Sequence, residues 1–331
     1  MKKRLVDLRA GGAPILDIVS YGRGGIRSLT QPQIEQIART VDRAPEVMVK
    51  VTGGARTIAG VHSHMSYIGR EGDLGVESDM GERLQAKGFE TAMSIDWNLD
   101  LEAHERQTER SILGLRKPPK LVHNIIFSMP EGTPPEKVLR AVRKLANDEF
   151  ALKHRYGMAL HSDEPHPHVH VVVKAMSEQG ERLNIRKATL RSWRTQFAAN
   201  LREQGVTANA TERAVRGQTA IQKRTSIFRA TQRGESTHMN ARIRFVSADL
   251  TKRSVEPDPH KETLAETRRH VEHGWSVVND LFERDGQMQT ARDVPRFLAQ
   301  MRTPQTEQEQ IAELIRTRSA GSRDDRDNRF R

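Results

Sequence analysis

Residues 161–173 of the chain read HSDEPHPHVHVVV. Four histidines and Asp163 fall within ten residues, and the segment then becomes rich in β-branched valine, which favours strands. Alternate side chains of a strand point to one face, so His168 and His170 project together while the intervening valines face a core. Residues 156–161 are also typical of a short strand, and the polar, proline-containing segment between the two strands can close a hairpin.

A third histidine joins the pair in this hairpin. Cross-strand neighbours lie about 5 Å apart, so His161 can reach His168 and His170. Three neutral imidazoles held by a rigid sheet predict a divalent-metal site with open coordination positions. Asp163 is placed to accept a hydrogen bond from a ring N–H and so to orient a ligand. His166 lies between two prolines, and the sequence leaves open whether it belongs to the loop or to the site.

Composition limits the classes of partner and compartment. The formal net charge of +11 indicates a polyanionic partner. Nucleic acid is favoured over a membrane surface, because no strongly amphipathic basic helix with large apolar residues is evident. No apolar run approaches the length of a membrane span and no signal peptide is expected, so we predict a cytoplasmic protein without membrane insertion. The absence of cysteine excludes disulfides and thiolate ligands.

Hydrophobic patterning predicts alternating strands and helices over residues 46–204. The predicted strands cover residues 46–51, 121–129, 156–161, 168–173 and 182–185. The predicted helices cover residues 55–67 and 188–204, and another starts after the turn at residues 130–135 with Thr133 as its expected N-cap. Residues 69–100 are expected to be loop and short helix. This order predicts an α+β fold with a central, mainly antiparallel sheet flanked by helices.

The chain is predicted to have four parts. Residues 1–42 form a basic N-terminal arm that ends in a helix over residues 31–41, and residues 43–217 form the main domain. Residues 218–318 have a helical pattern, with helices expected near 220–232, 260–283 and 307–317. Residues 319–331 have a disordered composition.

One of the three tyrosines is a candidate nucleophile. A metal on a basic protein indicates phosphoryl chemistry on nucleic acid, with either water or a side chain as the attacking group. Tyr67 lies in the segment HSHMSYIGREG (residues 62–72), at the end of the helix that follows the first strand, and Arg70 beside it can bind a phosphate. Taken alone, Tyr67 is better explained as a helix-end tyrosine packed on the core. Further candidate phosphate contacts are Arg182, Arg186, Lys187 and Arg191.

Three blocks of sequence resemble a known family. They are the strand, Gly53-Gly54 turn and helix that lead to Tyr67, the strand-to-turn block HNIIFSMPEGT (residues 123–133), and the histidine block of residues 161–170. The weaker segment NATERAVRG (residues 209–217) follows them. In this order they resemble the relaxases of conjugative and mobilizable DNA, within the HUH endonucleases, and most closely the mobilization nucleases related to T-DNA border endonucleases.

The resemblance implies a site and an activity. Tyr67 matches the catalytic tyrosine, Asp163 matches the acidic catalytic position, and His161, His168 and His170 match the metal ligands, which in the family hold Mg²⁺ or Mn²⁺. It implies that the chain nicks and rejoins one strand at a transfer origin through a 5′-phosphotyrosine. The expected partners are single-stranded or supercoiled DNA, accessory relaxosome proteins and a type IV secretion coupling protein.

The chain departs from the family pattern at one position, and three alternatives to the relaxase function remain open. Some relatives carry a second acid just before the histidine-proline pair, where this chain has Pro165, so either Asp163 acts alone or Glu164 substitutes. A rolling-circle replication initiator or a transposase-type HUH nuclease shares the chemistry. A non-catalytic basic DNA-binding protein with a structural metal forms no covalent adduct, and a nuclease that uses water does not need Tyr67.

Overall fold

The computed structural model describes residues 18, 27–85, 87–105, 114, 118–218, 225–250, 258 and 260–327. These residues form two compact units. The first covers residues 35–210, and the second covers the described residues before 35 and from 211 onward. Most of the predicted N-terminal arm lies outside the described residues, but its helix is present as α2 (Gln31–Val41).

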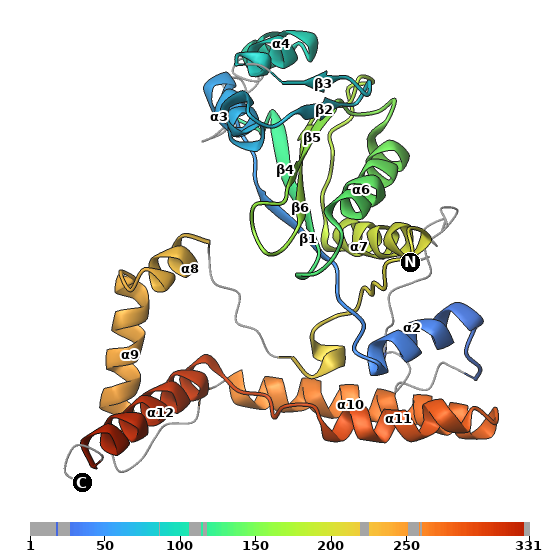
Figure 1. The fold of residues 1–331 in the computed structure, drawn as a ribbon, viewed down its shortest axis with the longest axis vertical. Helices are drawn as coiled ribbons and strands as arrows, with labels where there is room; N and C mark the ends of the chain where they lie inside the picture. Colours follow the sequence, from blue (N-terminus) through green and yellow to red (C-terminus); the bar gives the residue numbers. More distant parts are fainter. Residues whose placement is uncertain are drawn as a thin grey trace. The chain divides into compact units, whose positions relative to one another are not determined.

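A six-stranded sheet forms the centre of the first unit (Figure 1). Its strands, in spatial order, are β1 (Met48–Gly53), β4 (Val122–Ser128), β6 (His168–Lys174), β5 (Tyr156–His161), β2 (Val76–Ser78) and β3 (Arg83–Leu84). Every pair of neighbours is antiparallel. Its helical segments are α3 (Ile58–Ile68), the 3-10 turn η2 (Arg70–Gly72), α4 (Phe89–Asp96), α6 (Pro135–Phe150) and α7 (Lys187–Glu203). The predicted α+β fold with an antiparallel sheet flanked by helices is confirmed.

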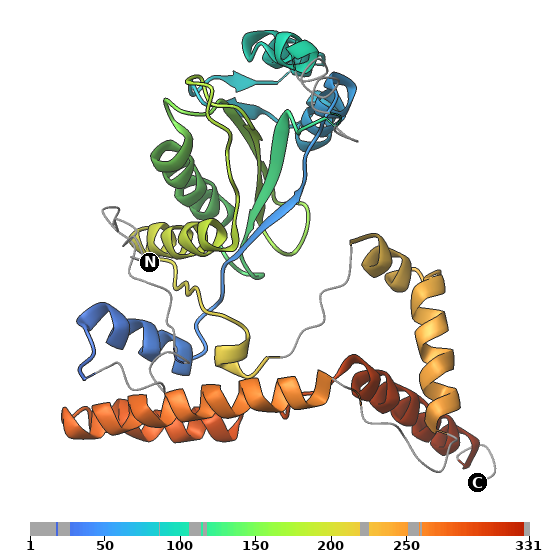
Figure 2. The same cartoon turned by 180° about the vertical axis from the view of Figure 1, so that it is seen from behind.

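The two faces of the sheet are covered by different helices (Figures 1 and 2). Val169, Val171 and Val173 pack with α6 and α7 in the larger core, where Trp193 and Phe197 are fully buried. On the other face, residues of α3 and α4 form a second core with Val172. Because strand side chains alternate, His168 and His170 share the α3 face.

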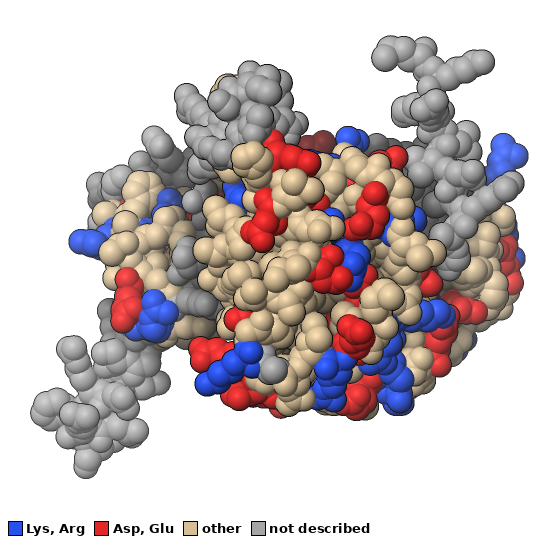
Figure 3. Space-filling view, turned by 90° about the horizontal axis from the view of Figure 1, so that it is seen from above, with Lys and Arg blue, Asp and Glu red and all other residues tan. Residues whose placement is uncertain are grey.

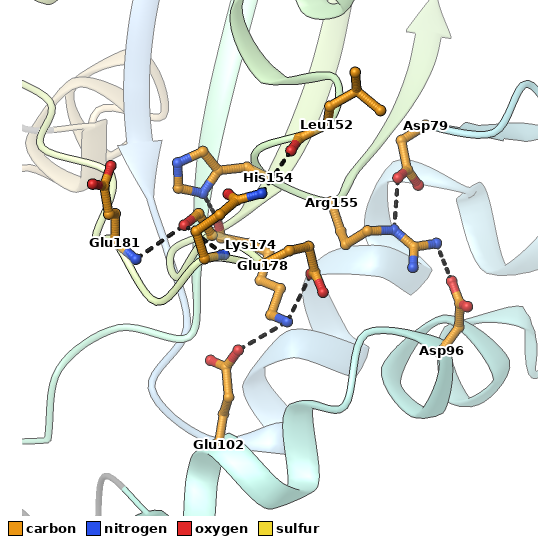
Figure 4. A network of polar contacts seen from close by, with 11 residues as sticks. Asp79, Asp96, Glu102, Leu152, His154, Arg155, Lys174, Glu178 and Glu181 are labelled. Atoms are coloured by element: carbon orange, nitrogen blue, oxygen red, sulfur yellow. Dashed lines mark hydrogen bonds and ion pairs between the residues drawn. The ribbon is translucent and has the colours of Figure 1, made fainter.

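A polar network fixes the end of β6 that lies away from the histidines (Figure 4). The buried Lys174 ammonium lies 3.0 Å from a Glu102 carboxylate oxygen and 3.1 Å from one of Glu178. Arg155 donates to Asp79 at 2.6 Å and also pairs with Asp96. These contacts join the ends of the central strands to α4 and the neighbouring loops.

The structure corrects three details of the sequence prediction. Residues 69–100 contain the β2–β3 hairpin, whose strands are too short to show a periodic pattern. The segment 182–185 forms only an isolated bridge from Arg182 to Met176. Thr133 is not the N-cap of α6, because its hydroxyl donates to the Pro130 carbonyl at 2.9 Å and Pro134 occupies the cap position.

The second unit is helical. Its elements are η3 (Ala214–Arg216), α8 (Thr225–Gln232), α9 (Thr237–Leu250), α10 (His260–Arg284), α11 (Met288–Ala299) and α12 (Glu307–Asp327). Helices α10 and α11 pack through Trp275 and Phe297, whose ring centroids lie 5.1 Å apart. Helix α12 continues to Asp327, so residues 319–327, which composition assigned to a disordered tail, are helical. Among the described helices, none combines the length and apolar character needed to cross a bilayer.

Candidate metal centre and neighbouring tyrosine

The register of the β5–β6 hairpin brings three histidines together. His161 and His168 are direct cross-strand partners, and His170 lies two residues further along β6 on the same face. Ring centroids are 4.5 Å apart for His161 and His170, 5.1 Å for His168 and His170, and 5.2 Å for His161 and His168. One ring nitrogen from each lies within 4.8 Å of the others, and all three residues are buried.

Hydrogen bonds leave at least one ring nitrogen of each histidine available. A carbonyl only accepts, so His161 donates from Nε2 to the Ile68 carbonyl at 2.8 Å and keeps Nδ1 for a ligand. His168 likewise donates from Nδ1 to the His166 carbonyl at 3.0 Å and keeps Nε2. Neither ring nitrogen of His170 has a partner among the described residues, although both are buried. Buried polar atoms normally have partners, so this set of donors fits a divalent metal.

Burial and nearby charges favour the neutral form of two of the rings. Burial, followed by the nearby His161 and His168, lowers the pKa of His170 to about 3. Burial also lowers the pKa of His161, and the Arg70 cation adds to this effect while the hydrogen bond to Ile68 opposes it. Neutral imidazole is the form that binds metals, so His161 and His170 are ready to act as ligands without losing a proton.

Helix α3 places Tyr67 beside these rings. The helix begins at an N-cap, Thr57, whose hydroxyl accepts from the Gly60 N–H at 3.2 Å. At its other end the Ile68 carbonyl accepts the hydrogen bond from His161, which ties the end of the helix to the triad. The Tyr67 side chain is 48% exposed, and its ring centroid lies 5.6 Å from that of His170. The tyrosine is therefore open to a macromolecular substrate while it touches the histidine cluster.

Arg70 and Asp163 form a pair above the tyrosine. Arg70 donates from Nη2 to Asp163 Oδ2 at 2.6 Å, and its guanidinium carbon lies 5.8 Å from the centre of the Tyr67 ring. Arg70 and Glu71 have φ of 49° and 57°, a left-handed conformation that is strained for residues with a side chain. Desolvation raises the pKa of Asp163, but hydrogen bonds from its own backbone and from Arg70 lower it more, so its net pKa lies below the ordinary value.

The position of Asp163 differs from the sequence expectation. We expected its carboxylate to accept from a histidine ring N–H, but the carboxylate binds Arg70, and the ring N–H groups of His161 and His168 bind carbonyls. Asp163 lies in the exposed loop between β5 and β6, which turns it towards the 3-10 segment after Tyr67. His166 is a loop residue whose Nδ1 accepts from the Glu131 N–H at 3.1 Å.

Two further polar residues beside the triad were missed from the sequence. Asn124, on β4, donates to His64 Nδ1 at 2.9 Å, and its own carbonyl oxygen is buried without a partner among the described residues. Burial, followed by the Lys120 cation, lowers the pKa of His64. The spacing of His64, three residues before Tyr67 on the same helical face, was the signal available in the sequence.

Only one of the candidate phosphate contacts lies at the triad. Arg70 is there, whereas Arg186, Lys187 and Arg191 are exposed at the start of α7, which covers the opposite face of the sheet. Arg182 donates to the Lys120 carbonyl at 3.5 Å. On the face seen in Figure 3, basic and acidic side chains are interspersed.

Fold and site define a class: a basic α+β protein with a buried three-histidine centre next to an exposed tyrosine. Residues 76–206 match the family model for relaxases, described as the MobA/VirD2-like nuclease domain. This segment contains the triad and Asp163, and Tyr67 lies before its first residue. The chain is thus related to the MobA/VirD2-like relaxases.

Individual relatives agree with the family match. The chain is 26% identical over 240 residues to the T-DNA border endonuclease VirD2 of Agrobacterium fabrum, covering 66% of this chain and 50% of that protein. It is 27% identical over 240 residues to VirD2 of Rhizobium rhizogenes, covering 66% and 51%. VirD2 of Rhizobium radiobacter is 26% identical over 234 residues, covering 66% and 52%. The chain spans about half the length of these curated relatives.

Proposed function

We propose that this chain is a relaxase that nicks and rejoins one DNA strand at a transfer origin, with Tyr67 as its nucleophile. The observation that carries the proposal is the exposed Tyr67 ring, 5.6 Å from the ring of His170 in a buried triad. The relation to MobA/VirD2-like relaxases supports the same assignment. The proposed nicking domain covers residues 43–217.

The reaction is a transesterification. The phenolic oxygen of Tyr67 forms a bond to the scissile phosphorus, and the bond from phosphorus to the 3′ oxygen breaks. The proton of the phenol is balanced by the proton gained at the new 3′-hydroxyl, and the 5′ end stays attached to the tyrosine. One phosphodiester replaces another, so the step is nearly isoenergetic and can be reversed to rejoin the strand.

The surrounding residues would bind and orient the phosphate. Arg70, held by Asp163 beside the phenol, carries a planar guanidinium that suits phosphate oxygens. His161, His168 and His170 would hold the metal, and Mg²⁺ or Mn²⁺ bound there would neutralise negative charge on the non-bridging oxygens. We further propose that the protein acts in the cytoplasm, with accessory relaxosome proteins and a type IV secretion coupling protein.

Covalent capture tests the proposal. The full chain is mixed with Mn²⁺ and labelled single-stranded DNA from the presumed transfer origin, and the products are separated on a denaturing gel. We expect a labelled band of protein size that Tyr67→Phe or EDTA abolishes. Tyr156→Phe is the matched control, because this buried tyrosine binds Asn147 at 2.6 Å and should leave the adduct intact.

Each other outcome favours a different class. Cleavage without an adduct that survives Tyr67→Phe would show a nuclease that uses water. An adduct formed at a replication origin but not at a transfer origin would favour a rolling-circle initiator. Metal-dependent stability without any cleavage would favour a DNA-binding protein with a structural metal.

A further inference from the structure

A pocket of about 350 Å³ lies against the histidine triad on the open part of the sheet. Its walls come from the ends of β1 and β4 and from the loop before β6. The residues that line it are Glu46, Met48, Ile126, Ser128, Met129, Pro130, Glu164, His166 and His168. His168 belongs both to the pocket and to the triad, so the two are continuous.

The sheet register fixes the distance from the triad to the pocket. Met48 pairs with Ser128, Ser128 pairs with His168, and His168 pairs with His161, so all four share one row and one face. Two strand spacings of about 4.8 Å put Met48 about 10 Å from His168. The nucleotide attached to a phosphate at the triad can reach this far.

The pocket offers an apolar surface beside polar groups. Met48 is 46% exposed on the edge strand β1, and Ile126 on β4 is partly exposed beside it. An unpaired base has two apolar faces, which such side chains can cover. Lys50 lies on the same face, in the next row with Ile126 and His170, and supplies a positive charge for a neighbouring phosphate.

We propose that this pocket binds the nucleobase next to the scissile phosphate and selects a base that carries an amino group. The inference rests on the proposed nicking function. Glu164, an exposed carboxylate at the pocket wall, makes no hydrogen bond or ion pair with any other described residue. A carboxylate only accepts hydrogen bonds, so it matches the amino groups of cytosine, adenine and guanine. Thymine has no amino group, and its single donor, N3–H, lies between two carbonyl oxygens that a carboxylate repels.

Binding of short oligonucleotides tests the pocket independently of cleavage. Fluorescent single strands of about 12 nucleotides, oligo(dC) and oligo(dT), have the same length and charge. Cytosine has an amino group at C4, whereas thymine has a carbonyl oxygen there, an N3–H and a methyl group. They are titrated by anisotropy into the full chain carrying Tyr67→Phe. We expect oligo(dC) to bind about five- to 150-fold more tightly, the range for one well-placed hydrogen-bonded contact to a base.

Glu164→Gln supplies the decisive comparison. The amide of the introduced glutamine can donate to a thymine carbonyl oxygen, so the difference in affinity between oligo(dC) and oligo(dT) should disappear. Glu131→Gln, a neighbouring exposed carboxylate outside the pocket lining, should preserve the difference. The proposal is overturned if both oligonucleotides bind equally to the parent protein, or if Glu164→Gln leaves their ratio unchanged.

Covalent capture separates this inference from the function on which it rests. Once the nick site is mapped from the adduct, each flanking base is replaced in turn by the other three. Discrimination against thymine at one flanking position, lost in Glu164→Gln, supports the pocket. An adduct that forms equally with all four bases overturns the pocket while leaving the relaxase assignment intact.

Discussion

Replacing Asp163 by asparagine distinguishes two roles for this carboxylate. If it oriented a metal-binding histidine, its loss would reduce metal affinity about 10- to 100-fold. The structure instead pairs it with Arg70 at 2.6 Å, through side chains that are 58% and 35% exposed. We therefore expect Asp163→Asn to leave Mn²⁺ affinity nearly unchanged and to weaken the positioning of Arg70.

The size of the effect follows from the exposure of the pair. Solvent screens exposed ion pairs, which contribute about 0.2–1 kcal/mol. This range corresponds to about 1.4- to fivefold in the equilibrium constant for holding Arg70 beside the Tyr67 phenol. Nicking by Asp163→Asn should fall by at most about fivefold, and the free energy of unfolding should fall by less than about 1 kcal/mol.

The affinity for Mn²⁺ is measured by calorimetric titration into the full chain. The rate of nicking is measured as the rate of adduct formation under single-turnover conditions. The double variant with Arg70→Ala should be no slower than Arg70→Ala alone by more than about 1.4-fold, because Asp163 would act only through the cation of Arg70. A tenfold loss of Mn²⁺ affinity, or additive losses in the double variant, would refute this reasoning.

Three further predictions concern the fold and the binding face. Gly54→Ala should lower the free energy of unfolding by about 1–3 kcal/mol, because φ is 149° and a Cβ would lie 2.2 Å from the Val122 carbonyl oxygen; the adjacent Gly53→Ala, with nothing within 4 Å, should be nearly neutral in the same urea titration. Burial and then neighbouring cations lower the pKa of His123 to about 4 in the folded chain. The unfolded chain therefore protonates His123 at a higher pH than the folded chain does, and the free energy of unfolding decreases as pH falls from about 6.5 towards 4. Discounted for partial exposure, the decrease in the free energy of unfolding is about 1–2 kcal/mol. The stability of His123→Gln should depend less on pH over the same range, and an equal pH dependence would exclude His123 as the cause. Lys50→Ala should weaken single-stranded DNA binding and reduce the slope of log affinity against log salt by about 1, whereas an unchanged slope would show that Lys50 contacts no phosphate.

The triad could be predicted because it depends on local geometry. His168 and His170 are two residues apart on one strand, and His161 lies on the preceding strand of the same hairpin. All three can therefore be placed from residues that are close together in sequence. The Arg70–Asp163 pair joins residues 93 apart in sequence, through a left-handed turn that no periodic pattern signals. The His64–Asn124 contact joins residues 60 apart in sequence and could not be predicted either, because the packing of α3 against β4 is a tertiary feature.

The length of an element also limited the prediction. Strands β1, β4, β5 and β6 have six or seven residues each, enough for alternation to show. Strand β2 has three residues and β3 has two, and neither forms a pattern of its own. They are held by tertiary packing, with Val76 buried in the core beneath α3 and α4.

The hydrogen bond from His161 to the Ile68 carbonyl joins the metal centre to the helix that carries the tyrosine. Any ion that immobilises the His161 ring also immobilises the carbonyl to which the ring is bonded. Metal occupancy and the order of the last turn of α3 are therefore thermodynamically linked, and each must favour the other. Amide hydrogens in this turn should exchange with deuterium more slowly in Mn²⁺ than in EDTA, and a DNA strand that orders the same turn should in return hold the metal more tightly.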